Sequence, residues 1–134
     1  MRQYAIRVAG PFLVLRIRDD RFDRLAYNER EEALRTISVL APARAESLAV
    51  ELLSGTRVIS SEAHEQTRVL ACELLGDIAR SKEALDALQT ASTQRWKSSE
   101  RVRSAAANAL GEIQVRGERE AAARRTAKRP RAAS

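Results

Sequence analysis

The sequence is poor in the side chains that most catalytic and metal-binding sites require. Its 134 residues include one cysteine, Cys72, and one histidine, His64. A single cysteine excludes an intrachain disulfide and a cysteine-cluster metal site. On one helix the two residues would stand about 12 Å apart, too far for a cysteine–histidine nucleophile pair. We therefore expect both to be packed structural residues, and we expect a protein without catalytic residues, cofactor or metal ion.

Aromatic residues and clustered glycines are also scarce. Phe, Trp and Tyr make up 4% of the chain, and the five glycines are scattered, so there is no glycine-rich phosphate loop. Abundant alanine and leucine favour closely packed helices over strands. The apolar stretch from Pro11 to Leu15 is too short to span a bilayer and runs into Arg16. We expect an all-α, soluble, cytoplasmic protein.

Positive charge is concentrated at one end of the sequence. The formal net charge is +6, and residues 121–134 hold five cations and no acid, which leaves the rest near neutrality. Such a segment is typical of a disordered basic tail, predicted here over 126–134. It can make weak, salt-sensitive contacts with nucleic acid or an acidic surface, or it can simply be solvated. The cations are Arg124, Arg125, Lys128, Arg129 and Arg131.

Three segments of the chain resemble one another. They begin at Arg30, Arg68 and Arg103, which are 38 and 35 residues apart. Each has alanine three positions on, a large aliphatic residue at the seventh position and Leu or Ile at the tenth. The last two also share a glycine followed by an acid. This period is typical of two-helix repeats. The matched residues are Ala33, Ile37 and Leu40; Ala71, Leu75 and Ile78; Ala106, Leu110 and Ile113; and Gly76–Asp77 with Gly111–Glu112.

Each segment is amphipathic with helical period and is predicted to be the first helix of a pair. A second helix is predicted to begin at Pro42 and end before Gly55, and another to be capped by Ser81. The second helix of the third pair, predicted near residues 117–125, has no Leu, Ile or Val and can bury little surface. Asn28, Ser60 or Ser61, and Ser98 or Ser99 are the predicted caps of the first helices.

Residues 101–113 resemble the first helix of HEAT repeats, in particular the short bacterial ones first noted in phycobilisome lyases. The resemblance implies a right-handed α-solenoid of about three antiparallel helix pairs. The implied parts are an N-terminal capping segment (1–27), the repeats (28–54, 61–91 and 99–125) and the tail. It also implies an armadillo-like scaffold for protein–protein interaction, and it says little about the partner. The matching residues are Val102, Arg103, Ala106, Leu110, Gly111 and Ile113, whereas Glu29, Ser38 and Thr67 depart from the pattern in the earlier repeats.

In two-helix solenoids the second helices usually line the concave face, where partners bind. The polar residues expected there carry mixed charge, which suits a protein better than a polyphosphate backbone, although plain solvation is their ordinary fate. Trp96 lies in the 92–99 connection, where it either seals the seam between repeats or forms an exposed hot spot. The predicted partner-binding residues are Arg44, Glu51, Lys82, Asp86, Gln89 and Trp96.

The recurring arginines have a structural and a functional interpretation. We favour a ladder in which Arg30, Arg68 and Arg103 bond acids such as Asp77 or Glu112 of neighbouring repeats, over a row that faces a ligand. The sequence thus predicts a non-catalytic scaffold that binds another protein. A nucleic-acid-associated protein that uses the basic tail is the alternative, and a bilin lyase subunit is a third reading that rests on fold analogy alone.

Overall fold

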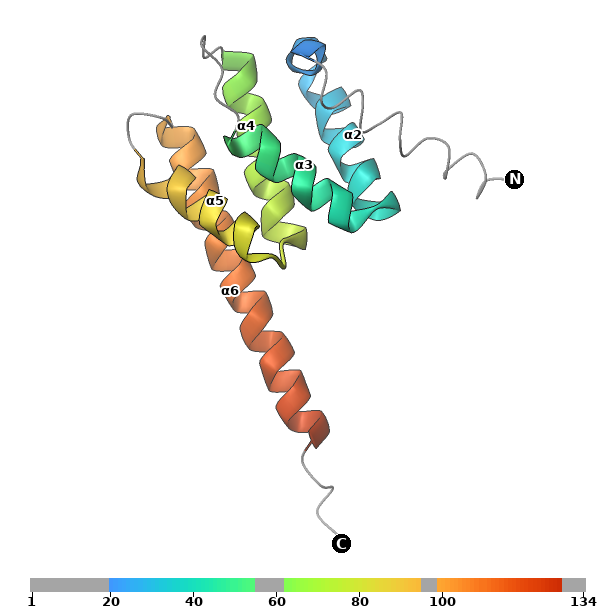
Figure 1. Cartoon of the computed structure of the whole chain (residues 1–134), viewed down its shortest axis with the longest axis vertical. Helices are drawn as coiled ribbons and strands as arrows, with labels where there is room; N and C mark the ends of the chain where they lie inside the picture. Colours follow the sequence, from blue (N-terminus) through green and yellow to red (C-terminus); the bar gives the residue numbers. More distant parts are fainter. Residues whose placement is uncertain (1–19, 55–61, 95–98, 129–134) are drawn as a thin grey trace, which may run out of the picture.

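A computed structural model describes residues 20–54, 62–94 and 99–128 of the chain. These residues form five α-helices and one 3-10 helix and contain no strand (Figure 1), which confirms the predicted all-helical class. The elements are η1 (Asp20–Arg24), α2 (Tyr27–Leu40), α3 (Pro42–Ser54), α4 (Glu62–Ile78), α5 (Lys82–Thr93) and α6 (Glu100–Lys128).

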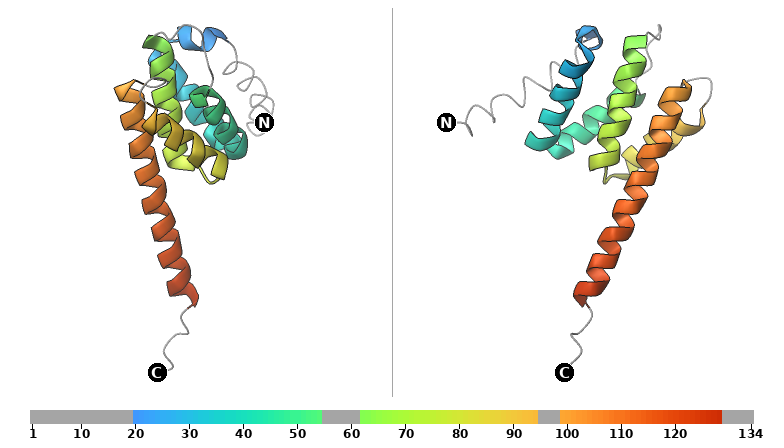
Figure 2. Two further views of the ribbon diagram at one scale, coloured as in Figure 1. Left: turned by 60° about the vertical axis from the view of Figure 1, so that its left-hand side comes forward. Right: turned by 180° about the vertical axis from the view of Figure 1, so that it is seen from behind.

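The helices lie in two layers. In one layer α2, α4 and α6 stand side by side, with α4 between the other two (Figure 2). In the other layer α3 contacts α5, α3 also contacts both α2 and α4, and α5 also contacts α6. This arrangement fits an α-solenoid in which α2 and α3 form one helix pair and α4 and α5 the next.

Aliphatic side chains from all five α-helices fill the space between the layers. Ile37, Leu48, Leu75, Leu88 and Val102, one from each helix, are at most 2% exposed. Burial of one such side chain contributes about 1.5–3 kcal/mol. The apolar stripes read from the sequence therefore form the core that holds the layers together.

The end of the chain differs from the predicted third helix pair. The sequence predicts a helix that ends near residue 113, a second helix over about 117–125 and a disordered tail from 126. Instead α6 is one helix of 29 residues, which runs from Glu100 through Gly117 to Lys128. Residues 129–134 lie outside the described residues, and so do residues 1–19 of the predicted capping segment.

The composition of residues 117–128 explains this outcome. A returning second helix would bury only alanine, so folding it back onto α6 would gain little. A continuous helix keeps every backbone hydrogen bond, and Ala, Glu and Arg are strong helix formers. The segment therefore extends α6 beyond the other helices (Figure 1). The described part of the chain has two helix pairs followed by one long helix.

Arg116 attaches α6 to the end of α4. Its guanidinium donates hydrogen bonds to the carbonyl oxygens of Gly76, Asp77 and Ala79 at 2.7, 2.5 and 2.6 Å. The last carbonyls of a helix lack partners within it, and a cation is favourable at that end. These hydrogen bonds fix α6 to the end of α4 at a point three residues after residue 113, where the sequence predicted that this helix would end.

The two helix pairs are joined by a carboxylate at the start of α5. Glu46 of α3 accepts hydrogen bonds from the backbone N–H groups of Arg80 and Ser81 and from the Ser81 hydroxyl, at 2.9, 2.8 and 2.7 Å. Burial raises the pKa of Glu46, but these hydrogen bonds outweigh burial and lower the pKa below its usual range.

The predicted serine caps of α5 and α6 are present. Ser81 and Ser99 accept hydrogen bonds from Ala84 N–H and Val102 N–H at 3.2 and 3.3 Å. The prediction that Asn28 caps the first helix is wrong, because α2 begins at Tyr27 and its N-cap residue is Ala26. Ser60, Ser61 and Ser98 lie outside the described residues.

Candidate functional site

His64 belongs to a buried polar network that joins η1, α2 and α4. Its Nδ1 atom lies 3.1 Å from Asp23 Oδ2, and the Thr67 hydroxyl donates to Asp23 Oδ1 at 2.7 Å. Arg30 donates to Thr67 Oγ1 at 2.8 Å and to Gln66 Oε1 at 2.7 Å. No member of the set Asp23, Arg30, His64 and Thr67 is more than 8% exposed. Because these groups bond one another in the interior, the arrangement is that of a structural network and not of a substrate site.

Cys72 lies in the core of α4 and is fully buried. Burial raises the pKa of its thiol to about 12, although the nearby Arg68 guanidinium acts in the opposite direction. A thiol that stays protonated is a poor nucleophile and a poor metal ligand. Among the described residues, no cluster of three or more His, Cys, Asp or Glu side chains is suited to hold a metal ion.

We expect Cys72 to resist alkylation in the folded protein. At pH 8 the raised pKa makes its thiolate fraction about a thousandfold smaller than that of an ordinary thiol, and burial blocks access as well. Iodoacetamide labelling followed by mass spectrometry, in buffer and in 6–8 M urea (roughly the range that unfolds small domains), measures the difference. Labelling at equal rates in the two conditions would contradict the buried position.

Two of the repeated arginines, Arg30 and Arg68, donate hydrogen bonds to uncharged groups. Arg30 of α2 bridges to α4 through Ala63 O, Thr67 Oγ1 and Gln66 Oε1. Arg68 Nε donates to Leu53 O of α3 at 3.1 Å. Contacts between helix pairs do exist, but the prediction that Asp77 or Glu112 accepts from Arg30 is wrong.

The residues predicted on the second helices are exposed but do not surround one hollow. Arg44 and Glu51 lie on α3, and Lys82, Asp86 and Gln89 lie on α5. We call these five residues the second-helix strip. Of the five, only Asp86 lines the hollow of about 370 Å³ between α3 and α5.

The other predicted contacts fall at the ends of described segments. Arg124 and Arg125 are exposed near the end of α6. Trp96, Arg129 and Arg131 lie outside the described residues, and of Lys128 only its place as the last residue of α6 is described.

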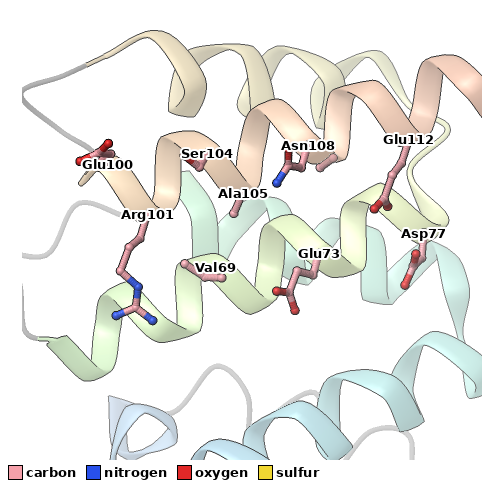
Figure 3. Close-up of a pocket in the computed structure, with 10 residues that line it drawn as sticks. Val69, Glu73, Asp77, Glu100, Arg101, Ser104, Ala105, Asn108 and Glu112 are labelled. Atoms are coloured by element: carbon pink, nitrogen blue, oxygen red, sulfur yellow. The ribbon is translucent and has the colours of Figure 1, made fainter.

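An open groove of about 740 Å³ lies between α4 and α6 (Figure 3). We call it the α4–α6 groove. Small and apolar side chains form part of its lining, together with four acidic residues and a single arginine. At Asp77, Asn108 and Glu112 it continues into a second hollow of about 800 Å³ that reaches Val115 and Arg119. The lining residues are Val69, Glu73, Asp77, Glu100, Arg101, Ser104, Ala105, Asn108, Ala109 and Glu112.

Glu73 lies at the centre of the negative charge. Burial raises its pKa, and the carboxylates of Glu31, Asp77 and Glu112 raise it further. Glu31 belongs to α2, so the acidic surface extends over all three helices of the first layer. A positively charged occupant would relieve the repulsion among these carboxylates.

A close approach of two helices sets the shape of the groove at one end. A Cβ atom built on Gly76 of α4 would lie 3.2 Å from Ala109 Cα and 2.6 Å from Glu112 Oε2. At Gly111, the equivalent position one repeat later, a Cβ atom would meet none of the described residues of other helices within 4 Å.

Sequence reasoning missed the α4–α6 groove for a specific reason. It placed binding on the second helices, by analogy with longer solenoids, so the acids on the first helices were treated only as partners of arginine. Two signals were present. Glu73 and Asp77 are four residues apart on one helix face, and Glu112 repeats Asp77 one repeat later.

Comparison with known proteins gives one positive result. The family model described as HEAT repeats matches residues 56–127, just over half of the chain. Searches of curated proteins and of solved structures returned no match. Across the described ranges, every helix is either too short or too polar to cross a bilayer.

Proposed function

The chain belongs to the family of HEAT-repeat proteins, and we propose that it is a non-catalytic scaffold or adaptor that binds another protein along the α4–α6 groove. HEAT repeats are generally protein-interaction scaffolds. The observation that carries the proposal is the groove itself, which combines a partly apolar lining with charged groups that remain accessible to a partner. Protein interfaces use this combination of an apolar centre and a polar rim.

Volume and charge favour the α4–α6 groove over the second-helix strip. The groove has about twice the volume of the hollow between α3 and α5, about 740 against about 370 Å³. Its excess of carboxylates repels a phosphate backbone, so it does not suit nucleic acid. The second-helix strip and nucleic-acid binding through the basic residues 124–131 stay predictions, each with a distinct outcome in the experiment below.

A matched pair of tryptophan variants tests the proposal. We expect Asn108→Trp, which fills the centre of the α4–α6 groove, to abolish capture of the partner that the wild-type chain retains from nuclease-treated lysate of its source. Gln89→Trp places the same side chain on the exposed second-helix strip and should leave capture within about threefold of wild type, because it blocks no groove contact. Quantitative mass spectrometry of the retained proteins measures both.

Other results would overturn this assignment. Loss of the partner in Gln89→Trp alone would place binding on α3 and α5. Loss of all partners on nuclease treatment, together with their loss on deletion of residues 121–134, would favour nucleic-acid association through the tail. Equal helix content of the three proteins, measured by circular dichroism, shows that the variants are folded.

The handedness of the solenoid, its helix pairing and the subfamily of its repeats stay predictions. We still expect a right-handed solenoid with antiparallel helix pairs. We also expect residues 101–113 to be most similar to the short bacterial repeats of phycobilisome lyases. Lyase activity forms no part of the proposal.

A further inference from the structure

The final part of α6 has no neighbouring helix among the described residues. Glu120 makes an ion pair with Arg80 at 3.3 Å. The C-terminal part of α6 extends away from the other helices (Figures 1 and 2). Residues 122–127 are all exposed, and Val115, just before this part, is 46% exposed. A protruding helix that carries an exposed apolar residue presents a surface that another chain can cover.

We propose that α6 pairs in the opposite direction with α6 of a second copy of this chain, so that the basic end of each helix occupies the α4–α6 groove of the other copy. This inference rests on the proposed function, since it names the occupant of the same groove. Charge complementarity selects that occupant. The groove has four carboxylates and one guanidinium, whereas residues 121–128 at the end of α6 have three cations and no acid.

One face of α6 runs from the groove to the end of the helix. Residues spaced three and four apart lie on one side of a helix, so the residues that line the groove and those beyond it form a single stripe. Small side chains at several of these positions allow a second helix to approach closely. The stripe consists of Arg101, Ser104, Asn108, Glu112, Val115, Arg119, Ala122 and Thr126.

Val115 sets the register of the pairing. It lies midway along this stripe, so the Val115 side chains of two copies can meet at a two-fold axis. Glu112 is three residues before it and Arg119 four residues after it, about 4.5 and 6 Å along the axis at 1.5 Å per residue. In the reversed pair, Arg119 of each copy therefore reaches the level of Glu112 of the other, and this contact occurs twice.

A second cation matches the centre of the groove. Arg125 lies ten residues after Val115, and Ala105 lies ten residues before it. In the reversed pair these two positions share one level, and Glu73 of α4 lies beside Ala105 and Asn108 in the groove (Figure 3). The pairing therefore brings the exposed Arg125 of one copy close to Glu73 of the other copy, whose carboxylate is repelled by three neighbouring carboxylates.

The same molecule cannot make these contacts with itself. Ser104 in the groove and Arg125 in the basic end are parts of one continuous helix and stand about 32 Å apart along its axis. Bringing them together would require α6 to unfold at its centre. A second copy supplies the basic end without that cost, and two-fold symmetry closes the assembly at a dimer.

Sedimentation of the full chain tests the inference. We expect a reversible monomer–dimer equilibrium that weakens as salt is raised from 50 to 500 mM, roughly from a 14 Å to a 4 Å screening length. Arg119→Glu and Glu112→Arg should each raise the dimer dissociation constant at least about tenfold, because each creates two like-charge contacts. The double variant E112R/R119E restores opposite charges and should return the constant to within about threefold of wild type.

A matched control separates this register from a general effect of charge. Arg124→Glu makes the same charge change on the opposite side of α6, where Arg124 Nε faces its own helix at Glu120 O, and should leave the dissociation constant within about threefold. Equal weakening by R119E and R124E, or failure of the double variant to rescue, would overturn the inference. So would a chain that stays monomeric at about 200 μM in low salt, or open-ended polymers in place of a dimer.

The two proposals fail in different ways. If the chain stays monomeric but Asn108→Trp still loses its lysate partner, the second copy is the wrong occupant and the proposed function stands. If dimers form and respond to the charge swap as expected, but Asn108→Trp retains every lysate partner, the groove serves self-association and its role toward another protein is overturned.

Discussion

Replacing Gly76 with leucine is expected to lower the free energy of unfolding by about 3 kcal/mol, at the upper end of what overpacking costs. The first carbon of the side chain would lie 3.2 Å from Ala109 Cα, which is backbone and cannot rotate away. The Glu112 carboxylate, at 2.6 Å, can move, so the clash with Ala109 decides the effect. Higher helix propensity of leucine offsets the loss by about 1 kcal/mol at most.

Gly111 provides the matched control, because it occupies the equivalent position one repeat later. Among the described residues, no atom of another helix lies within 4 Å of a Cβ placed there, so Gly111→Leu is expected to leave stability unchanged or to raise it by up to about 1 kcal/mol. Urea unfolding followed by circular dichroism measures both variants. Equal destabilisation at the two positions would contradict the close approach of α4 and α6 at Gly76.

The two glycines also show what a repeat pattern predicts and what it omits. The pattern correctly assigns both to first helices. The need for a glycine depends on a neighbour, however, and Gly76 faces α6 while nothing among the described residues packs on Gly111. Self-similarity therefore predicts the register within each helix but not where the packed array ends.

The same distinction explains which parts of the fold could be predicted. Core positions such as Leu75 and caps such as Ser81 depend on local spacing, and the structure has them as predicted. The course of residues 114–128 depends on a balance between a poorly buried second helix and a continuous one. Arg116 influences that balance through carbonyls about forty residues earlier in the chain, a contact that no local pattern reveals.

The candidate site was harder to predict than the fold. Analogy with longer solenoids directed attention to the second helices, whereas the structure has its larger hollows between the first helices. The acids involved come from α2, α4 and α6, so the shared negative surface appears only after the helices are assembled. Glu73 had no assigned role in the sequence, because its neighbours Glu31 and Glu112 are about forty residues away along the chain.

The buried network around Arg30 is expected to produce the second large loss of stability. Arg30→Met keeps much of the side-chain volume but removes the donors to Ala63 O, Thr67 Oγ1 and Gln66 Oε1. It also removes the guanidinium from a network that contains the buried carboxylate of Asp23. Breaking a buried charged network by removing one member costs about 3–5 kcal/mol. The buried Arg30 Nε has no hydrogen-bond partner among the described residues, so its removal returns about 1 kcal/mol, and we expect a net loss of about 3 kcal/mol.

Arg35→Met on the same helix is the control for this variant. Arg35 is exposed and pairs with Glu31 four residues earlier at 2.6 Å, an interaction that contributes about 0.5 kcal/mol at most. If both variants changed the urea midpoint equally, Arg30 would act as a surface charge and the network would not join η1 and α2 to α4. A large loss of stability confined to Arg30→Met would show that this arginine, one of three that recur in the sequence, stabilises the interior of the protein. The role of the recurring arginine would then differ between the first two repeats, since Arg68 bonds the end of α3.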